Sequence, residues 1–132
     1  MTVFVDTSAF FAVLDRDDSN HGAAATAWAQ LLGESTTLVT NNYVLVETSA
    51  LVQHRLGLAA LRTFHDDIVP LLKVHWVTEE LHRSAVQAAL SAARKKLSLV
   101  DCCCFQTMRE RGVRKAFCVG KHFREQGFEV LP

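Results

Sequence analysis

The sequence contains few of the residues that interrupt regular structure, with two prolines and six glycines in 132 residues. It has no internal repeat, low-complexity tract or Pro/Gly-rich linker, which predicts a single domain over residues 1–132. Long apolar runs are also missing, and the opening residues MTVFVDTSAFF carry no basic stretch. We therefore expect neither a signal peptide nor a membrane span, and a cytoplasmic location.

Cysteine occurs four times, but not in the pattern of a disulfide scaffold. Cys102, Cys103 and Cys104 are consecutive, and Cys118 stands apart. Neighbouring cysteines cannot form good bridges with one another, and the paired spacing of zinc ligands is absent. We expect reduced thiols that pack in the core.

Charge is unevenly distributed along the chain, although the formal net charge is zero. Ten of the fourteen Lys and Arg residues lie between Arg83 and Arg124, with only Asp101 and Glu110 as acids among them. Such a block predicts a surface for an anionic partner, and a set of solvated helix faces is the alternative. The 49% hydrophobic content suits a soluble globular core.

The order of predicted elements indicates an α/β fold. Strands are predicted at residues 3–5, 37–39, 74–77, 116–119 and 128–131. Helical periodicity predicts helices at residues 21–33, 41–55, 58–72, 79–95 and 99–111, with a short turn at 121–126. Alternating strands and helices favour a parallel sheet covered on both faces. Ligands of such sheets bind beyond the carboxyl ends of the strands, and Asp6 follows the first strand directly.

Three carboxylates stand in apolar segments, namely Asp6, Glu47 and Asp101. An ionised carboxylate is costly to bury without a partner. Asp6 could cap a helix that starts near Thr7, Asp101 could form a capping box with Ser98, and Glu47 could face solvent or pair with a cation. If the three converge at one edge of the sheet, a divalent cation would relieve their repulsion, and oxygen ligands favour Mg²⁺ or Mn²⁺.

Four segments of the chain stand out in order: the opening VFVDTS with Asp6, the segment NYVLVET with Glu47, the segment LSLVD with Asp101, and residues 121–132. Taken together, they resemble PIN-domain ribonucleases of the VapC toxin type. The resemblance covers nearly the whole chain. It implies a three-layer α/β/α fold with a five-stranded parallel sheet, an acidic Mg²⁺ site and hydrolysis of RNA. It also implies a cognate antitoxin, as in type II toxin–antitoxin modules, and a homodimer.

Residue roles follow from this hypothesis. Asp6, Glu47 and Asp101 are the expected metal ligands and catalytic residues, and Glu47 is the candidate for orienting or deprotonating the attacking water. Ser8 is expected to donate to a carboxylate or to the phosphate. Four basic residues are expected to contact the RNA backbone: Arg94, Lys95, Lys96 and Lys121. Few aromatic residues accompany them, so no base-stacking pattern is predicted.

One position departs from the family pattern. The family usually has a fourth acid two residues before a His-Phe pair, and here Gly120 precedes His122 and Phe123. Glu125 is close in sequence but is predicted to lie on the far side of a helical turn. Loss of this acid should weaken a second metal position most, so we expect reduced nuclease activity. A catalytically degenerate module that binds RNA or an antitoxin is the alternative.

Other doubly wound folds are less consistent with the sequence. A receiver or phosphatase would bring a second acid close to the first-strand Asp, whereas Asp6 is followed by Thr-Ser-Ala. A nucleotide-binding fold would place a Gly-rich loop there. The six histidines show no ligand spacing and are expected to be surface or packing residues. The acidic run at residues 15–18 is expected to be a solvated loop.

Overall fold

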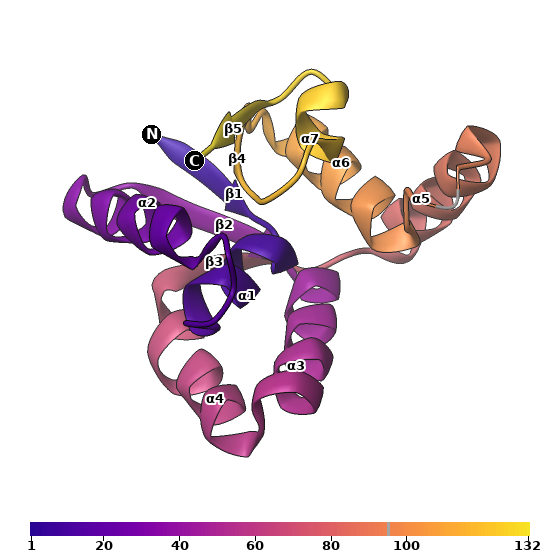
Figure 1. Cartoon of the computed structure of the whole chain (residues 1–132). Helices are drawn as coiled ribbons and strands as arrows, with labels where there is room; N and C mark the ends of the chain where they lie inside the picture. The colour runs from indigo at the N-terminus through magenta and orange to yellow at the C-terminus, as the bar shows by residue number, and fades with distance from the viewer. Residues whose placement is uncertain (95) are drawn as a thin grey trace.

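The computed structural model describes residues 1–94 and 96–132 and contains a five-stranded, all-parallel sheet (Figure 1). The strands lie in the order β3-β2-β1-β4-β5. Their bounds are β1 (Thr2–Val5), β2 (Thr37–Asn41), β3 (Leu72–His75), β4 (Lys115–Phe117) and β5 (Glu129–Leu131). The predicted α/β class with a five-stranded parallel sheet is confirmed.

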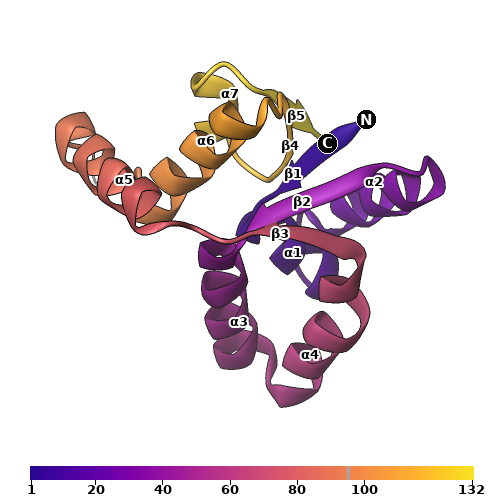
Figure 2. The same cartoon turned by 180° about the vertical axis from the view of Figure 1, so that it is seen from behind.

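Helices connect successive strands and form a layer on each side of the sheet. The first layer comprises α1 (Thr7–Leu14), α2 (His21–Gly33), α3 (Asn42–Leu56) and α4 (Leu58–Thr63). The second comprises α5 (Glu79–Ala92), α6 (Leu99–Arg111) and α7 (His122–Glu125). Figures 1 and 2 show the two layers on opposite sides of the strands, with α5 projecting beside α6. Among the described residues, no helix is both long and apolar enough to cross a bilayer.

The central strand β1 is buried because its side chains alternate between the two helical layers. The Phe4 ring lies 6.3 Å from that of Phe123 in α7, measured between centroids. Val5 pairs in register with Phe117, whose ring stacks 6.4 Å from Trp28 of α2. Burial on both faces explains why residues 3–5 form a continuous apolar run rather than an alternating one.

The predictions for residues 58–77 are wrong in their boundaries. The α-helix expected over 58–72 ends at Thr63 and continues as a π-helical turn (Phe64–Ile68) and a 3₁₀ turn (Val69–Leu71). Pro70, within the 3₁₀ turn, lacks the N–H that a longer α-helix requires. Strand β3 begins at Leu72 instead of 74, because Leu72 pairs in register with Leu38 of β2.

Two other boundaries also differ from expectation. Strand β4 ends at Phe117 rather than at 119, because the chain turns there toward Gly120, which has φ +98°. Helix α5 ends at Ala92, and Ala93 adopts a left-handed conformation that stops it. The predicted helical end at Lys95 lies outside the described residues. The cysteine prediction is confirmed, since all four cysteines are free and buried.

Candidate active site

The carboxyl end of β1 lies where the winding of the sheet reverses. The chain first adds β2 and β3 on one side of β1, then β4 and β5 on the other. Asp6 directly follows β1, and its backbone N–H donates to the Phe117 carbonyl of β4 at 3.0 Å. Glu47 lies in the second turn of α3, after β2, and Asp101 lies in the first turn of α6. This arrangement brings the three acids toward the edge of the sheet at which doubly wound folds bind ligands.

Asp6 is a buried helix cap with a hydrogen-bonded carboxylate. Its Oδ2 accepts hydrogen bonds from the Ser8 backbone N–H at 3.1 Å and from the Ser8 hydroxyl at 2.7 Å. Burial raises the pKa of the Asp6 carboxyl; the hydrogen bonds from Ser8 lower it, and the nearby Asp101 charge raises it. The capping alternative is therefore confirmed, and the same carboxylate interacts electrostatically with Asp101.

Glu47 lies at the surface and is linked to α1 through threonine hydroxyls. Partial dehydration raises the pKa of its carboxyl, a hydrogen bond from Thr7 lowers it, and the charges of Asp6 and Asp101 raise it. The Thr48 hydroxyl, which is buried, donates to the Thr7 hydroxyl at 2.9 Å. The solvent-facing alternative for Glu47 is thus correct, and its carboxylate nevertheless interacts with the other two acids.

Asp101 forms the predicted capping box with Ser98. Its Oδ2 accepts from the Ser98 backbone N–H at 3.1 Å, and the Ser98 hydroxyl accepts from the Asp101 backbone N–H at 3.0 Å. The same Oδ2 lies 3.5 Å from Nδ1 of His122, which is at the start of α7. Asp101 therefore joins α6 to the segment in which the family places its fourth acid.

The buried thiol of Cys104 interacts electrostatically with all three acids. Burial raises its pKa well above the ordinary value, and Asp6, Cys103, Asp101 and Glu47 raise it further. Because one thiol interacts with all three carboxylates, distant parts of the chain bring them to one region. The acids therefore share one region of the molecule, and their meeting at a common metal site stays a prediction.

The three carboxylates are not arranged as a closed ligand set. Within residues 1–94 and 96–132, no group of three His, Cys, Asp or Glu side chains is close enough to hold a metal ion. Two of the acids instead use their oxygens as helix caps. The donor chemistry and the mutual repulsion suit a hard cation, whose remaining coordination sites water would fill. The described residues therefore do not offer direct ligation by all three carboxylates, so a cation here would be held partly through water.

Gly120 occupies the position of the missing fourth acid and has a backbone conformation that suits glycine. Its φ is +98°, although a β-carbon added there would meet no heavy atom within 4 Å. Side chains are therefore disfavoured here by backbone strain rather than by lack of space. The carboxylate of Glu125, the other acid near this position in the sequence, lies 3.9 Å from the guanidinium of Arg94.

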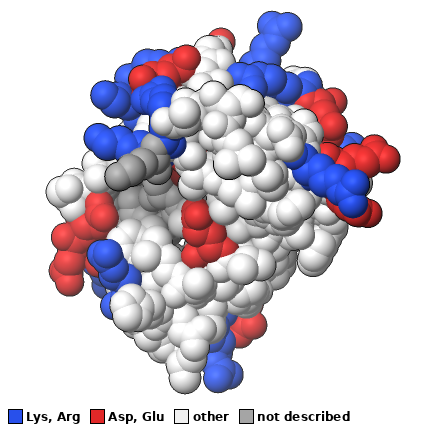
Figure 3. Space-filling view, turned by 90° about the vertical axis from the view of Figure 1, so that its right-hand side faces the viewer, with Lys and Arg blue, Asp and Glu red and all other residues white. Residues whose placement is uncertain are grey.

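Basic side chains flank the acidic site. Figure 3 shows acidic side chains at the centre of the face between α3 and the α5–α6 pair, with basic ones along its upper left edge. Lys96 and Lys121 are exposed, Arg94 pairs with Glu125, and Lys95 lies outside the described residues. The Ser8 hydroxyl donates to a carboxylate, which is the first of the two roles expected for it.

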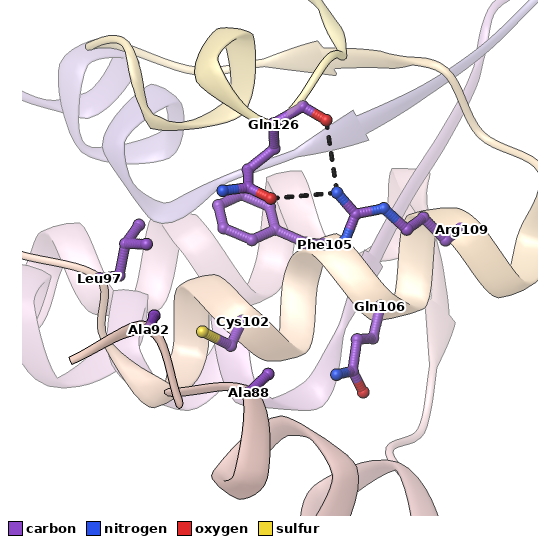
Figure 4. Close-up of a pocket in the computed structure, with 8 residues that line it drawn as sticks. All are labelled: Ala88, Ala92, Leu97, Cys102, Phe105, Gln106, Arg109 and Gln126. Carbon is purple, nitrogen blue, oxygen red and sulfur yellow. Dashed lines mark hydrogen bonds between the residues drawn. The ribbon is translucent and has the colours of Figure 1, made fainter. Parts of the chain in front are cut away.

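A small cavity between α5 and α6 is separate from the acids (Figure 4). Its volume is about 100 Å³, and Cys102 and Phe105 are among the residues that line it. Arg109 closes one side by donating to the Gln126 carbonyl at 3.3 Å and to its side-chain oxygen at 3.1 Å. The cavity has room for roughly three waters, so it is too small for a nucleotide.

Sequence reasoning missed several residues at this edge. His122 was expected to have only a surface or packing role, but it contacts Asp101. Trp76 is 72% exposed and shares an apolar groove of about 340 Å³ with Val46 of α3, the neighbour of Glu47. The His-Phe motif was a signal for His122. Nothing in the sequence marked Trp76 as exposed, because it lies in the run at residues 74–77 that predicts a strand.

Comparison with known proteins identifies the family. A model of the PIN domain matches residues 3–129. Two curated relatives, both described as the 23S rRNA-specific endonuclease VapC20, come from Mycobacterium tuberculosis strains CDC 1551 / Oshkosh and ATCC 25618 / H37Rv. Each is 32% identical over 132 residues, covering 98% of this chain and 98% of the relative.

Solved structures agree with this assignment. The crystal structure of Mycobacterium tuberculosis VapC20, described as a Sarcin-Ricin loop cleaving toxin, superimposes with a TM-score of 0.87 at 30% identity, covering 98% of this chain and 99% of that one. The structure of FitAcB from Neisseria gonorrhoeae has a TM-score of 0.70 at 14% identity over 100% of this chain and 97% of that one, which shows the fold alone. The chain therefore belongs to the PIN-domain family and is similar to VapC-type toxins along nearly its whole length.

Proposed function

We propose that this protein is a divalent-metal-dependent endoribonuclease of the VapC toxin type, with structured ribosomal RNA as its substrate. The observation that carries the proposal is the convergence of Asp6, Glu47 and Asp101 at the carboxyl edge of the sheet, where each charge raises the pKa of a neighbour. The similarity to a 23S rRNA-specific endonuclease supports the substrate class. The cytoplasmic location stays a prediction.

The three carboxylates would hold Mg²⁺, or Mn²⁺, with water completing the coordination. When bound, the ion supplies a water of lowered pKa and neutralises charge on the attacked phosphate. Asp6 is fixed by its bonds from Ser8, so it provides the rigid side of the site. Asp101 is fixed by the capping box.

Glu47 is the carboxylate best placed to orient or deprotonate the attacking water. It is exposed at the surface, unlike Asp6, and neither of its oxygens forms a helix cap. Its raised pKa makes it a stronger base than a free glutamate. Lys96 and Lys121, both exposed, would attract the RNA backbone toward this edge.

The test is cleavage of an RNA hairpin that carries the sarcin–ricin loop, with MgCl₂ or with EDTA. We expect site-specific cleavage only with the metal, and loss of cleavage in Asp6→Asn, Glu47→Gln and Asp101→Asn. The matched control is Asp66→Asn, since Asp66 is an exposed acid in the π-helical turn. Cleavage that is unaffected by EDTA, or that persists in all three variants, would refute the proposal.

A second candidate is a degenerate PIN module that binds RNA without cleaving it. Gly120 in place of the fourth acid favours it, as does the absence of a closed metal-ligand group in the described part of the chain. This candidate predicts RNA binding in the same assay without metal-dependent cleavage.

We also propose a cognate antitoxin as protein partner. The exposed apolar side chains of Val46 and Trp76 line a groove beside Glu47. An antitoxin segment covering this groove would bury apolar surface and obstruct the acidic edge at once. The homodimer stays a prediction, which light scattering of the purified chain would test.

A further inference from the structure

A second groove lies on the open part of the sheet, away from the three carboxylates. Helices α6 and α7 pack over β1 in this layer, since Phe4 lies near Phe123, whereas α5 packs against α6. Figure 2 shows β2 and β3 in front with no helix over them. The groove has a volume of about 210 Å³ and is lined by Thr2, Thr37, Val39, Lys73, His75, Arg111 and Val113.

Strand register places the groove's side chains on one face. Val39 pairs with Phe4 and with Lys73, so these three project into the same layer. His75 is two residues beyond Lys73 on β3 and shares this face, because side chains alternate along a strand. Arg111 reaches the groove from the last turn of α6.

The groove is basic, and its cations lack acidic partners. Lys73 and Arg111 form no salt bridge within the described residues, and no acid lines the groove. Dehydration lowers the pKa of His75, and the charges of Arg111 and Lys73 lower it further, so the three groups interact. Two uncompensated cations beside an imidazole and two threonine hydroxyls form a site for an anion.

We propose that this basic groove binds a backbone phosphate of the RNA substrate, remote from the cleaved bond. The identity of the ligand rests on the proposed function. Helix α6 connects the two sites, because Asp101 stands in its first turn and Arg111 in its last. Ten residues of α-helix span about 15 Å, so a contact in both places requires a ligand with charges repeated over that distance. A folded RNA meets this requirement, and one acidic side chain does not.

The experiment measures binding of a fluorescent sarcin–ricin hairpin RNA in EDTA, over a range of salt concentrations. The test variant is Lys73→Ala/Arg111→Ala. The matched control is Arg55→Ala/Arg62→Ala, which removes the same charge from exposed positions on α3 and α4. A third variant, Lys73→Arg/Arg111→Lys, keeps the charge and reports on packing.

Loss of the contact with this one phosphate should reduce the slope of log K against log salt by about 0.7–0.9 and weaken binding about 5- to 8-fold at 0.1 M salt. The control and the charge-preserving variant should keep the wild-type slope. The inference is overturned if the test variant keeps the wild-type slope or if the wild type does not bind the hairpin. It is also overturned if the charge-preserving variant loses as much RNA affinity as the test variant.

This result does not depend on catalysis. Groove-dependent binding without metal-dependent cleavage would uphold the groove and refute the nuclease proposal. Metal-dependent cleavage by the wild type, together with unchanged RNA binding in the test variant, would uphold the nuclease proposal and refute the groove.

Discussion

The Ser8 hydroxyl donates to the Asp6 carboxylate at 2.7 Å while it accepts from the Val119 backbone N–H at 2.9 Å. One hydroxyl therefore holds the first acid of the site and fixes the loop that leads to Gly120. The first turn of α1 and the β4–α7 connection, more than a hundred residues apart, meet at this group.

Replacing Ser8 with Ala should reduce RNA cleavage strongly. A hydrogen bond to a charged group contributes about 1.5–3 kcal/mol, which corresponds to roughly 10- to 150-fold in kcat/KM if the bond is needed only in the transition state. Ser8→Thr keeps the hydroxyl and should retain most of the activity. Equal activity of the Ala variant and the wild type in MgCl₂ would contradict the positioning role.

Asp6→Asn should stabilise the metal-free protein at neutral pH. Burial raises the pKa of Asp6 above its ordinary 3.8, so the folded state holds this proton more tightly than the unfolded state. The resulting stability is present below pH 3.8 and is lost as the pH rises through the folded-state pKa. Asn keeps the helix cap without the charge. Asp6→Asn should therefore have a higher Tm than the wild type in EDTA at pH 7.5. This difference in Tm should disappear as the pH is lowered.

Mg²⁺ should narrow the difference in Tm between Asp6→Asn and the wild type at pH 7.5. The ion stabilises the wild type because it binds only the folded protein. Circular dichroism melts of both proteins, with and without Mg²⁺, measure the effect. A wild type that melts above the variant in EDTA would show that Asp6 is stabilising as an ionised cap alone.

The two partners of the α6 capping box should separate stability from activity. Ser98→Ala removes the cap of α6 and should lower the free energy of unfolding by about 1 kcal/mol, while leaving most of the cleavage activity. Asp101→Asn keeps an oxygen that can accept from the Ser98 N–H, and should abolish cleavage with little loss of stability. Urea melts and cleavage rates of both variants would test this. Wild-type cleavage by a folded Asp101→Asn variant would contradict the role of this carboxylate.

Gly120→Asp should improve metal binding and reduce stability. The position has open space, but its φ of +98° strains any residue with a β-carbon, at a cost of roughly 1–3 kcal/mol. Gly120→Ala carries the same strain without the carboxylate and is the matched control. We expect higher Mg²⁺ affinity and faster cleavage for Asp than for Ala. Equal values for the two would show that position 120 does not face the metal.

The cysteines should resist modification in the folded protein. Burial raises the pKa of Cys103 to about 11 and that of Cys118 to about 12. Both thiols are therefore protonated at pH 8, and the thiolate is the reactive form. A thiol-reactive dye should label none of the four cysteines natively and all four in guanidinium chloride. Rapid labelling of the native protein would indicate opening around α6.

The sequence alone determined the fold class and the identity of the three acids. Short β-rich runs and a helical apolar period of 3.6 residues are local properties, so the strands and most helices are found close to where the sequence predicts them. The β3 boundary was wrong because pairing of Leu72 with Leu38 is not local. Asp6 and Asp101 were recognisable as caps from neighbours one to three residues away.

Only the tertiary structure decided how these pieces interact. The convergence of Asp6, Glu47 and Asp101 around Cys104 depends on the packing of α1, α3 and α6 at one edge of the sheet. The groove of Lys73, His75 and Arg111 depends on which part of the sheet α5 leaves uncovered. Sequence periodicity shows which face of its own helix or strand a residue occupies, but not which other element packs against that face. The interaction between charged side chains depends on their distance in space, so it is decided by this packing.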